Sequence, residues 1–221
     1  MPPVKSSLRI LLTGGGTIGH VAPVLAVADA LRSMATERHI ELELTYIGRR
    51  KGVEQAVVEQ AGLPFFGISA GKLRRYVDIQ NLVDPLRVMV GFFESLGILI
   101  RFRPDVLFAK GGYVSLPVVI AASWLKIPIV SHETDSVVGL ANRWAAHVAR
   151  TLCVAFPIAC YAHQRLRTTL IHTGNPVRAE FFTAGRPIRT KPPFTIVVFG
   201  GSQGSRSINR SLESLIEHPL P

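Results

Sequence analysis

The residues best suited to chemistry lie in three glycine-rich turns, each between a short apolar segment and a helix-forming segment. The turns are Thr13 to His20, Lys110 to Ser115 and Gly200 to Gly204. Glycines let the backbone turn sharply and approach a ligand without a Cβ in the way. A helix that follows such a turn offers unpaired amides and a partial positive charge, which favour an anion. Each turn therefore suits a phosphate group.

The first turn has two alternative interpretations. Gly14, Gly16 and Gly19 fit the spacing of the dinucleotide fingerprint, which is a weak signal by itself. A dinucleotide site would need an acidic residue about 20 positions on, at the end of the second strand. Gly48-Arg49-Arg50 occupies that region, and Arg49 would suit a 2′-phosphate. NAD(P) binding and a purely structural turn therefore stand as alternatives to a phosphate-bearing substrate.

The elements that must position these turns alternate between strand and helix along the chain. Continuous apolar runs, rather than clean alternation, indicate strands buried on both faces. The pattern predicts an α/β fold with a parallel sheet covered by helices on both sides. The expected strands are 8–12, 41–47, 65–68, 105–109, 127–131 and 151–155, and the expected helices are 21–34, 52–61, 116–125 and 140–149.

A second domain is expected to begin near the end of the chain. Residues 179–193 are rich in proline and basic residues, as in a linker. A strand at 194–199, a glycine turn and a helix at 208–217 then repeat the opening pattern. We therefore expect a first Rossmann-like domain over 1–178, a linker over 179–193 and the first β-α unit of a truncated second domain over 194–221. Turns from both domains would then line one crevice between them.

Composition narrows the range of partners. The chain has 221 residues, with 25 Lys and Arg against 15 Asp and Glu, giving a formal net charge of +10. This balance favours nucleic acid, an anionic membrane face or a phosphate-rich substrate, although a solvated basic surface would have the same composition. No nucleic-acid reader motif is present, so nucleic acid is not expected. Cys153 and Cys160 have no metal-site spacing, and no metal is expected.

Basic and apolar residues are interleaved over positions 72–103. Phe92 and Phe93 are adjacent, so one helix face cannot easily bury both. The segment would suit contact with anionic lipid headgroups, but a core helix of a single domain can have the same pattern. No apolar run reaches the roughly 18 residues that a spanning helix needs. Membrane contact would then be peripheral.

Five motifs in order resemble those of the MurG family of peptidoglycan transferases, in glycosyltransferase family 28. They are Gly15 to Pro23, Gly111 to Ser115, His132-Glu133, Gly174 to Arg178 and Gly200 to Gly204. The resemblance runs from Arg9 onward and implies a GT-B fold, with two Rossmann-like domains around the active site. It also implies inverting transfer of N-acetylglucosamine from UDP-GlcNAc to undecaprenyl-diphosphate-MurNAc-pentapeptide at the cytoplasmic face of the cell membrane. No cofactor or metal is implied.

The resemblance assigns roles to individual residues. Thr17, Gly19, Arg178 and Ser202 match positions that line the donor site, and the first two turns, with Ile18, Gly111, Gly112 and Tyr113, would face the acceptor diphosphate. Glu133 belongs to a substrate-binding motif. His20 matches the candidate general base, because neutral imidazole can accept a proton from an attacking hydroxyl near pH 7. The alternative is that His20 only caps or orients the loop.

Two positions depart from the family pattern. Ile18 stands where relatives usually have a second glycine, and its branched side chain restricts the turn. Asp135 stands where relatives have an Asn that contacts the donor. A carboxylate near a diphosphate should be repelled unless it is paired or exchanges a proton. We therefore expect Asp135 to share or take over the role of base, or to hydrogen-bond the acceptor sugar.

Two other functions remain open at this stage. One is a related GT-B transferase with a different lipid acceptor. The other is a membrane-bound module that binds the acceptor and recruits a separate donor-binding chain. In either case we expect this chain alone to lack transferase activity, because only residues 200–217 of the donor domain would be present.

Overall fold

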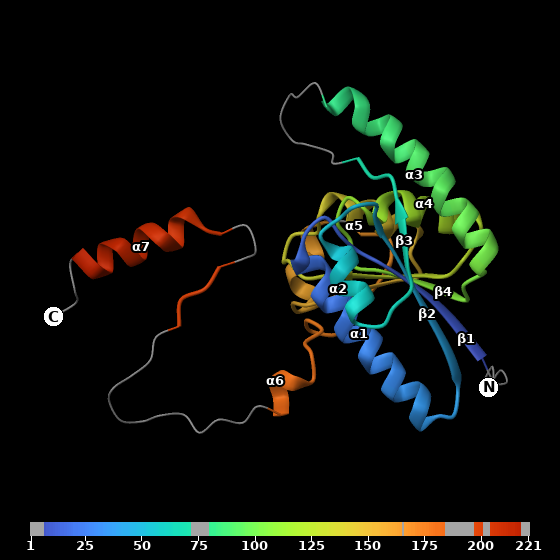
Figure 1. The fold of residues 1–221 in the computed structure, drawn as a ribbon, viewed down its shortest axis with the longest axis horizontal. Coiled ribbons are helices and arrows are strands. Elements are labelled where there is room, and N and C mark those ends of the chain that lie inside the picture. Colours follow the sequence, from blue (N-terminus) through green and yellow to red (C-terminus); the bar gives the residue numbers. More distant parts are fainter. Residues whose placement is uncertain (1–6, 72–79, 165, 184–196, 201–203, 218–221) are drawn as a thin grey trace. The chain divides into compact units, whose positions relative to one another are not determined.

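The computed structural model describes residues 7–71, 80–164, 166–183, 197–200 and 204–217 of the chain (Figure 1). The chain divides into two compact units, Met1–Ala179 and Glu180–Pro221. The first unit holds a parallel sheet and all of its covering helices. The second unit holds two helices among its described residues.

The first unit is built on a seven-stranded sheet in the order β3-β2-β1-β4-β5-β6-β7, with every neighbouring pair parallel. This confirms the expected α/β fold with a parallel sheet. The last strand was not expected from the sequence. The strands are β1 Ser7–Thr13, β2 Glu41–Arg49, β3 Phe65–Ile68, β4 Val106–Ala109, β5 Ile129–Glu133, β6 Thr151–Val154 and β7 Thr169–His172.

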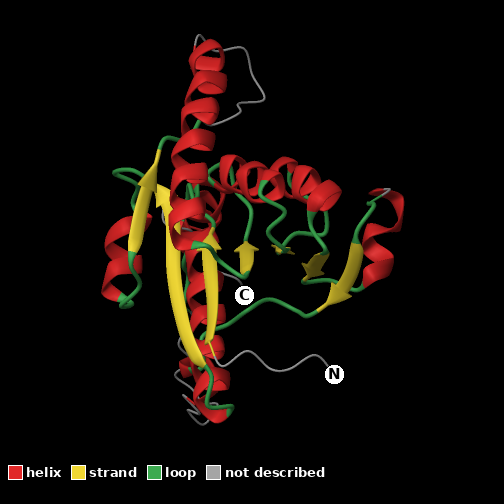
Figure 2. Cartoon of the chain, turned by 90° about the vertical axis from the view of Figure 1, so that its right-hand side faces the viewer, coloured by secondary structure: helices red, strands yellow, loops and turns green. Residues whose placement is uncertain are grey.

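Helices lie against both faces of this sheet (Figures 1 and 2). Each expected helix is present, with ends that differ from the expected ones by a few residues. The helices of the first unit are α1 Ile18–Glu37, α2 Glu54–Gln60, α3 Gln80–Phe102, α4 Ser115–Trp124, α5 Leu140–Val148 and the 3-10 helix η1 Ile158–Gln164. None of the described helices is long and apolar enough to cross a membrane.

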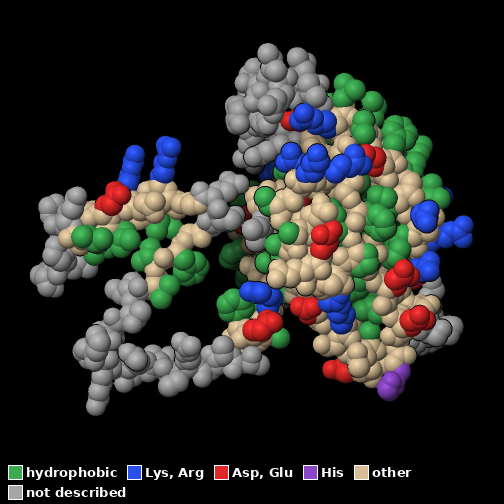
Figure 3. All heavy atoms as spheres, viewed as in Figure 1, with side chains coloured by type: hydrophobic (Ala, Val, Ile, Leu, Met, Phe, Trp, Pro, Cys, Tyr) green, Lys and Arg blue, Asp and Glu red, His purple; other side chains and the backbone are tan. Residues whose placement is uncertain are grey.

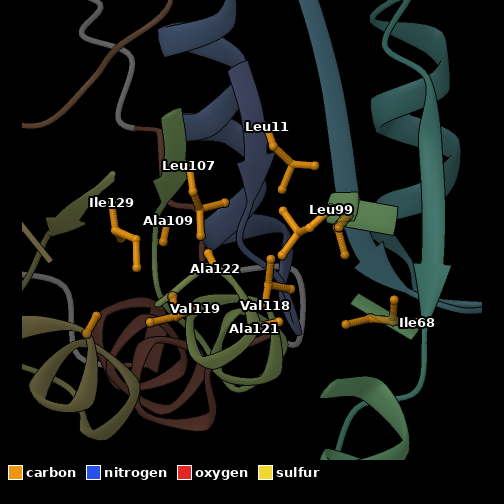
Figure 4. Close-up of a cluster of buried hydrophobic side chains, with 12 residues drawn as sticks. Leu11, Ile68, Leu99, Leu107, Ala109, Val118, Val119, Ala121, Ala122 and Ile129 are labelled. Atoms are coloured by element: carbon orange, nitrogen blue, oxygen red, sulfur yellow. The ribbon is translucent and has the colours of Figure 1, made fainter. Parts of the chain in front are cut away.

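Two hydrophobic cores explain why the strand segments are apolar throughout. Ile10 and Leu12 of β1 pack on the side covered by α1 and α2, together with Val24 and Val58. Leu11 faces the opposite side, in a cluster with residues of α3 and α4 (Figure 4). Because successive strand residues point to opposite faces, burial on both sides requires an unbroken apolar run.

The second unit differs from the sequence-based expectation. Its helices are α6 Glu180–Thr183 and α7 Arg206–Glu217, close to the helix expected at 208–217. Of the strand expected at 194–199, the first three residues lie outside the described part, and Val197 to Phe199 form no strand. Their side chains are largely exposed, 73% for Val197 and 82% for Phe199. An apolar segment becomes a strand only where neighbours supply hydrogen bonds, and the described residues of this unit include no other strand.

Candidate functional site

Three strands of the first unit end side by side at one edge of the sheet. β1, β4 and β5 are consecutive neighbours, with Thr13 opposite Ala109 and Ala109 opposite Ser131. The first glycine turn follows β1, the second follows β4, and the segment from Thr134 to Gly139 follows β5. These three connections therefore meet at the carboxyl edge of the sheet, where open parallel sheets bind their ligands.

A pocket of about 290 Å³ opens at this edge. Three helices, α1, α4 and α5, begin at the pocket, and in none of them does the side chain of the N-cap residue accept a hydrogen bond from the helix. Helix starts with available amides attract negative charge. The pocket is thus suited to an anionic group. Its lining consists of His20, Gly71, Gly112, Tyr113, Leu116, Glu133, Asp135, Gly139, Leu140, Ala141 and Asn142.

The second glycine turn packs directly on the first. Gly112 has φ +82°, and a Cβ there would overlap the carbonyl oxygen of Gly15 and lie 3.3 Å from His20 Cδ2. Gly111 has φ +90°, and a Cβ there would lie 2.7 Å from Nδ2 of Asn142. Both positions need glycine for their backbone angle and for space. The two turns form one continuous wall of the pocket.

Tyr113 lies across the first turn. Gly16 has φ +98°, and a Cβ at Gly16 would overlap the Tyr113 ring. The Tyr113 hydroxyl accepts a hydrogen bond from Nη1 of Arg49 at 3.3 Å. Arg49, which the sequence suggested for binding a 2′-phosphate, therefore contacts Tyr113, the aromatic residue that covers the first turn.

Buried polar groups support the first turn from below. The Tyr46 hydroxyl donates to the carbonyl oxygen of Gly14, and burial together with the nearby carboxylate of Glu54 raises the pKa of Tyr46. Oε1 of Glu54 accepts the backbone N–H of Arg49 at 2.9 Å and would lie 2.8 Å from a Cβ at Gly15. The turn is held in a fixed shape before any ligand arrives.

His20 combines partial burial with an unused ring nitrogen. Its Nδ1 is buried and has no hydrogen-bond partner among the described residues. Burial lowers the pKa of His20, the Lys110 ammonium lowers it further, and the carboxylates of Glu133 and Asp135 oppose this. An imidazole with a lowered pKa is neutral near pH 7 and can accept a proton. This chemistry matches the role of general base.

Glu133 is committed to the protein itself. Its carboxylate is buried and accepts hydrogen bonds from Asp135 N at 3.0 Å, Gly139 N at 2.9 Å and Asn142 Nδ2 at 3.0 Å. These contacts fix the connection between β5 and the start of α5. Glu133 lines the pocket, as expected of a substrate-binding residue, but its oxygens shape the loop.

Asp135 is the exposed carboxylate of the pocket. Its backbone is held at both ends, because its N–H donates to Glu133 and its carbonyl accepts the Tyr161 hydroxyl at 2.9 Å. The side chain lines the same pocket as His20. The structure thus brings together the two residues that the sequence suggested for proton transfer.

Comparison with known proteins identifies the family. Residues 10–154 match the N-terminal domain of glycosyltransferase family 28. The chain belongs to this family. A UDP-N-acetylglucosamine–N-acetylmuramyl-(pentapeptide) pyrophosphoryl-undecaprenol N-acetylglucosamine transferase from Clostridium perfringens is 39% identical over 96% of the chain. The match covers 59% of that transferase, so the chain spans somewhat more than half of its relative's length.

Solved structures share the fold of this family-28 domain. Acinetobacter baumannii MurG superimposes with a TM-score of 0.61 at 23% identity, covering 84% of this chain and 48% of that one. A putative UDP-N-acetylglucosamine 2-epimerase from Listeria monocytogenes gives a TM-score of 0.56 at 13% identity, covering 76% and 45%. At these identities the likeness shows the fold alone. It agrees with the GT-B type expected from the sequence.

The other expected site residues of the family-28 chain are spread more widely. Thr17 is the N-cap of α1, and Gly19 is exposed in its first turn. Arg178 is exposed and does not line the pocket, although its motif is tethered, because His132 Nε2 contacts the carbonyl oxygen of Gly174 at 2.9 Å. The side chain of Ile18 and the whole of Ser202 lie outside the described residues.

Sequence reasoning did not single out Lys110, Asn142 and Tyr161. Lys110 is 1% exposed and directly follows β4. A charged residue at the end of an apolar strand was the sequence signal that could have identified it. Asn142 lies at the start of a helix that carries other polar residues, so the sequence held no signal for its burial. Tyr161 lies in the 3-10 helix η1, and its contact with Asp135 joins segments 26 residues apart, which no local pattern indicates.

Proposed function

We propose that this chain is the acceptor-binding portion of a transferase that moves N-acetylglucosamine from UDP-GlcNAc to undecaprenyl-diphosphate-MurNAc-pentapeptide. Support comes from the family-28 domain and from a relative whose name states this reaction. The observation that carries the proposal is the pocket itself. Three helix starts and two interlocked glycine turns, suited to an anion, surround a histidine suited to accept a proton.

In this proposal the acceptor diphosphate lies against the starts of α4 and α5. Its charge would interact favourably with the amides near Tyr113 and Leu140. The sugar would then extend toward His20 and Asp135. His20 takes the proton of the acceptor hydroxyl while the oxygen attacks the anomeric carbon of N-acetylglucosamine, and the bond to UDP breaks with inversion. Asp135 hydrogen-bonds the acceptor sugar or shares the proton.

The donor would be bound mainly by residues beyond this acceptor domain. Thr17, Gly19, Arg178 and Ser202 are the residues of this chain that we assign to donor contacts, following the family motifs. Residues 1–178 act as the acceptor domain, 179–193 as a linker and 194–221 as the start of the donor domain. The chain by itself is therefore expected to bind acceptor without turning over UDP-GlcNAc.

A lipid acceptor requires access to a membrane, and an exposed patch on α3 and α4 provides a surface for it. We define the aromatic patch as Met89, Phe93, Ile120 and Trp124, with Phe93 60% and Trp124 71% exposed. The Phe92 ring joins the two helices, with centroids 5.1 Å from Phe93 and 5.6 Å from Trp124. Figure 3 shows apolar side chains along the outer side of α3, with basic groups on the same face of the molecule.

Exposed aromatic side chains on a chain with a formal net charge of +10 suit the interface of an anionic bilayer. We therefore place the protein on the cytoplasmic face of the cell membrane as a peripheral protein. Nucleic acid has no part in this proposal.

Calorimetric titration tests the acceptor assignment directly. The ligand is a water-soluble acceptor analogue, a MurNAc-pentapeptide diphosphate on a short prenyl chain, and inorganic pyrophosphate is the competitor. We expect the chain to bind the analogue, pyrophosphate to weaken that binding, and UDP-GlcNAc to bind more weakly than the analogue. No binding of the analogue by the folded chain, or preference for UDP-GlcNAc, would contradict the proposal.

A further inference from the structure

Lys110 is a buried cation behind the pocket. Its backbone N–H donates to the carbonyl oxygen of Thr13 at 2.8 Å, which continues the pairing of β4 with β1. Its side chain starts beneath the first turn, where a Cβ at Gly14 would lie 2.8 Å from Lys110 Cβ. The ammonium donates to Oγ1 of Thr134 at 3.3 Å, on the connection that follows β5. Lys110 thus bridges all three connections that build the pocket.

The ammonium is close to the charged groups of the site but is not part of the pocket surface. Lys110 is absent from the residues that line the pocket, so it is not placed to hold a ligand directly. Burial lowers the pKa of Lys110, and the carboxylates of Glu133 and Asp135 oppose that effect. An apolar side chain would fill the same space without the desolvation that a buried cation suffers. The reason for a buried charge at Lys110 must therefore lie in the groups around it.

His20 is the neighbour whose protonation matters for the proposed reaction. His20 and Lys110 approach the same residue of the first turn, because a Cβ at Gly14 would lie 2.8 Å from Lys110 Cβ and 3.4 Å from the carbonyl oxygen of His20. His20 also lines the pocket together with Glu133 and Asp135, at the end of β5. His132, also at the end of β5, is influenced by Lys110 in the same direction as His20. Two carboxylates beside an imidazole would favour its protonated form, which cannot act as a base. A buried cation at this position opposes them.

We propose that Lys110 is a positioning residue that offsets the charges of Glu133 and Asp135, so that the His20 imidazole stays neutral near pH 7. The catalytic importance of a neutral His20 rests on the proposed function. The electrostatic coupling of His20 to Lys110, Glu133 and Asp135 does not. Lys110 also ties Thr134 to β4 and so keeps Asp135 beside His20. The site then holds three charges around a neutral imidazole, and the cation adds to burial in keeping the base unprotonated.

The coupling has a signature that a merely structural lysine would lack. Removing the cation should raise the pKa of His20, because Glu133 and Asp135 are then opposed by burial alone. Removing the Asp135 carboxylate should lower the pKa of His20, because Lys110 then acts with less opposition. The two substitutions must shift the same proton equilibrium in opposite directions.

The experiment is an NMR pH titration of the histidine ring signals in the isotope-labelled chain, with His20 assigned by the loss of its signal in His20→Gln. The variants are Lys110→Met and Asp135→Asn, with Lys126→Met as the control that removes an exposed lysine after α4. We expect the His20 midpoint to move to higher pH in Lys110→Met, to lower pH in Asp135→Asn and to stay in place in Lys126→Met.

A His20 midpoint that does not rise in folded Lys110→Met would overturn the proposal. If Lys110→Met does not fold, Lys110→Gln, which keeps a donor for Thr134 but no charge, must give the same upward movement. The titration needs neither donor nor acceptor. A failure here therefore rejects the coupling alone, whereas failure to bind the acceptor analogue rejects the proposed function alone.

Discussion

The carboxylate of Glu133 accepts a hydrogen bond from the side-chain amide of Asn142 at 3.0 Å, which joins the end of β5 to the first turn of α5. The same amide also donates to the backbone carbonyl of His132 at 2.9 Å. Nδ2 of Asn142 in addition would lie only 2.7 Å from a Cβ at Gly111. This one contact therefore links β5, α5 and the second glycine turn around the pocket.

Loss of the Glu133 carboxylate should destabilise the domain. Glu133→Ala removes the acceptor of three hydrogen bonds, two from backbone N–H groups and one from the buried amide of Asn142, and we expect it to reduce the free energy of unfolding by about 2–4 kcal/mol. Glu133→Gln keeps one side-chain oxygen and should cost less. The control is Glu59→Ala on α2, where an exposed carboxylate accepts a hydrogen bond from the Gln55 side chain of the same helix, and its cost should stay within about 0.5 kcal/mol. Urea unfolding measures all three, and equal costs for Glu133→Ala and Glu59→Ala would refute the anchoring role.

Two glycine substitutions can separate the energetic cost of disturbing the packing between the two turns from the cost of backbone strain. Gly112 and Gly174 both have positive φ, +82° and +73°, but a Cβ at Gly174 would meet nothing within 4 Å. Gly174→Ala should therefore cost about 1–2 kcal/mol for the left-handed backbone alone. Gly112→Ala should cost about 1–3 kcal/mol more, because its methyl overlaps the Gly15 carbonyl. Thermal and urea unfolding of both variants provide the comparison, and similar costs would argue against the interlocked turns.

The two candidate proton acceptors can be ranked by kinetics. The assay requires an enzyme in which the first unit of this chain is joined to the donor domain of a family-28 transferase. His20→Ala should lower kcat by about 10²–10⁴-fold, which is the usual worth of general base catalysis. Asp135→Asn should lower kcat by less, since it retains the hydrogen-bonding shape of the side chain. Steady-state rates with UDP-GlcNAc and a lipid acceptor measure both, and an unchanged kcat in Asp135→Asn would remove Asp135 from the reaction.

The aromatic patch should decide membrane affinity. Phe93→Ser and Trp124→Ser each remove a large exposed side chain, worth about 1.5–3 kcal/mol when buried in an apolar environment. We expect each to weaken binding to anionic vesicles by about tenfold or more. Val53→Ser removes an exposed apolar side chain outside the patch and is the control. Vesicle flotation at low salt measures the bound fraction, and full binding by the Phe93→Ser/Trp124→Ser double variant would rule out the patch.

Local sequence patterns predicted the strands and turns that are determined by residues close together in the chain. Apolar runs predicted six of the seven strands, and glycines at Gly14 to Gly16 and at Gly111 and Gly112 predicted the turns. β7 was missed because Thr169–His172 is identified as a strand only by its pairing with β6, which the local sequence does not reveal. The strand expected at 194–199 was wrong over Val197–Phe199, since its apolar residues have no partner strand in the described part of that unit.

The site was predictable where motifs carried it and not where long-range contacts built it. His20, Gly112 and Asp135 were placed in one site by motif and do line one pocket. The burial of Lys110 and the contact of His132 with Gly174, 42 positions away, depend on how the strands are ordered in the sheet. The anchoring of Glu133 depends on how the connection after β5 folds back at the start of α5. Such contacts have no sequence period. They emerge only from the packed fold.

The most direct test of the central claim is to locate the acceptor on the chain by NMR. The acceptor analogue is titrated into the labelled chain, and the ring signals of His20 are followed with the amides of Gly112, Tyr113 and Leu140. We expect these signals to shift together and to saturate at the same analogue concentration. If the analogue binds and saturates while the His20 and Gly112 signals stay unchanged, the acceptor lies elsewhere and this pocket is not its site.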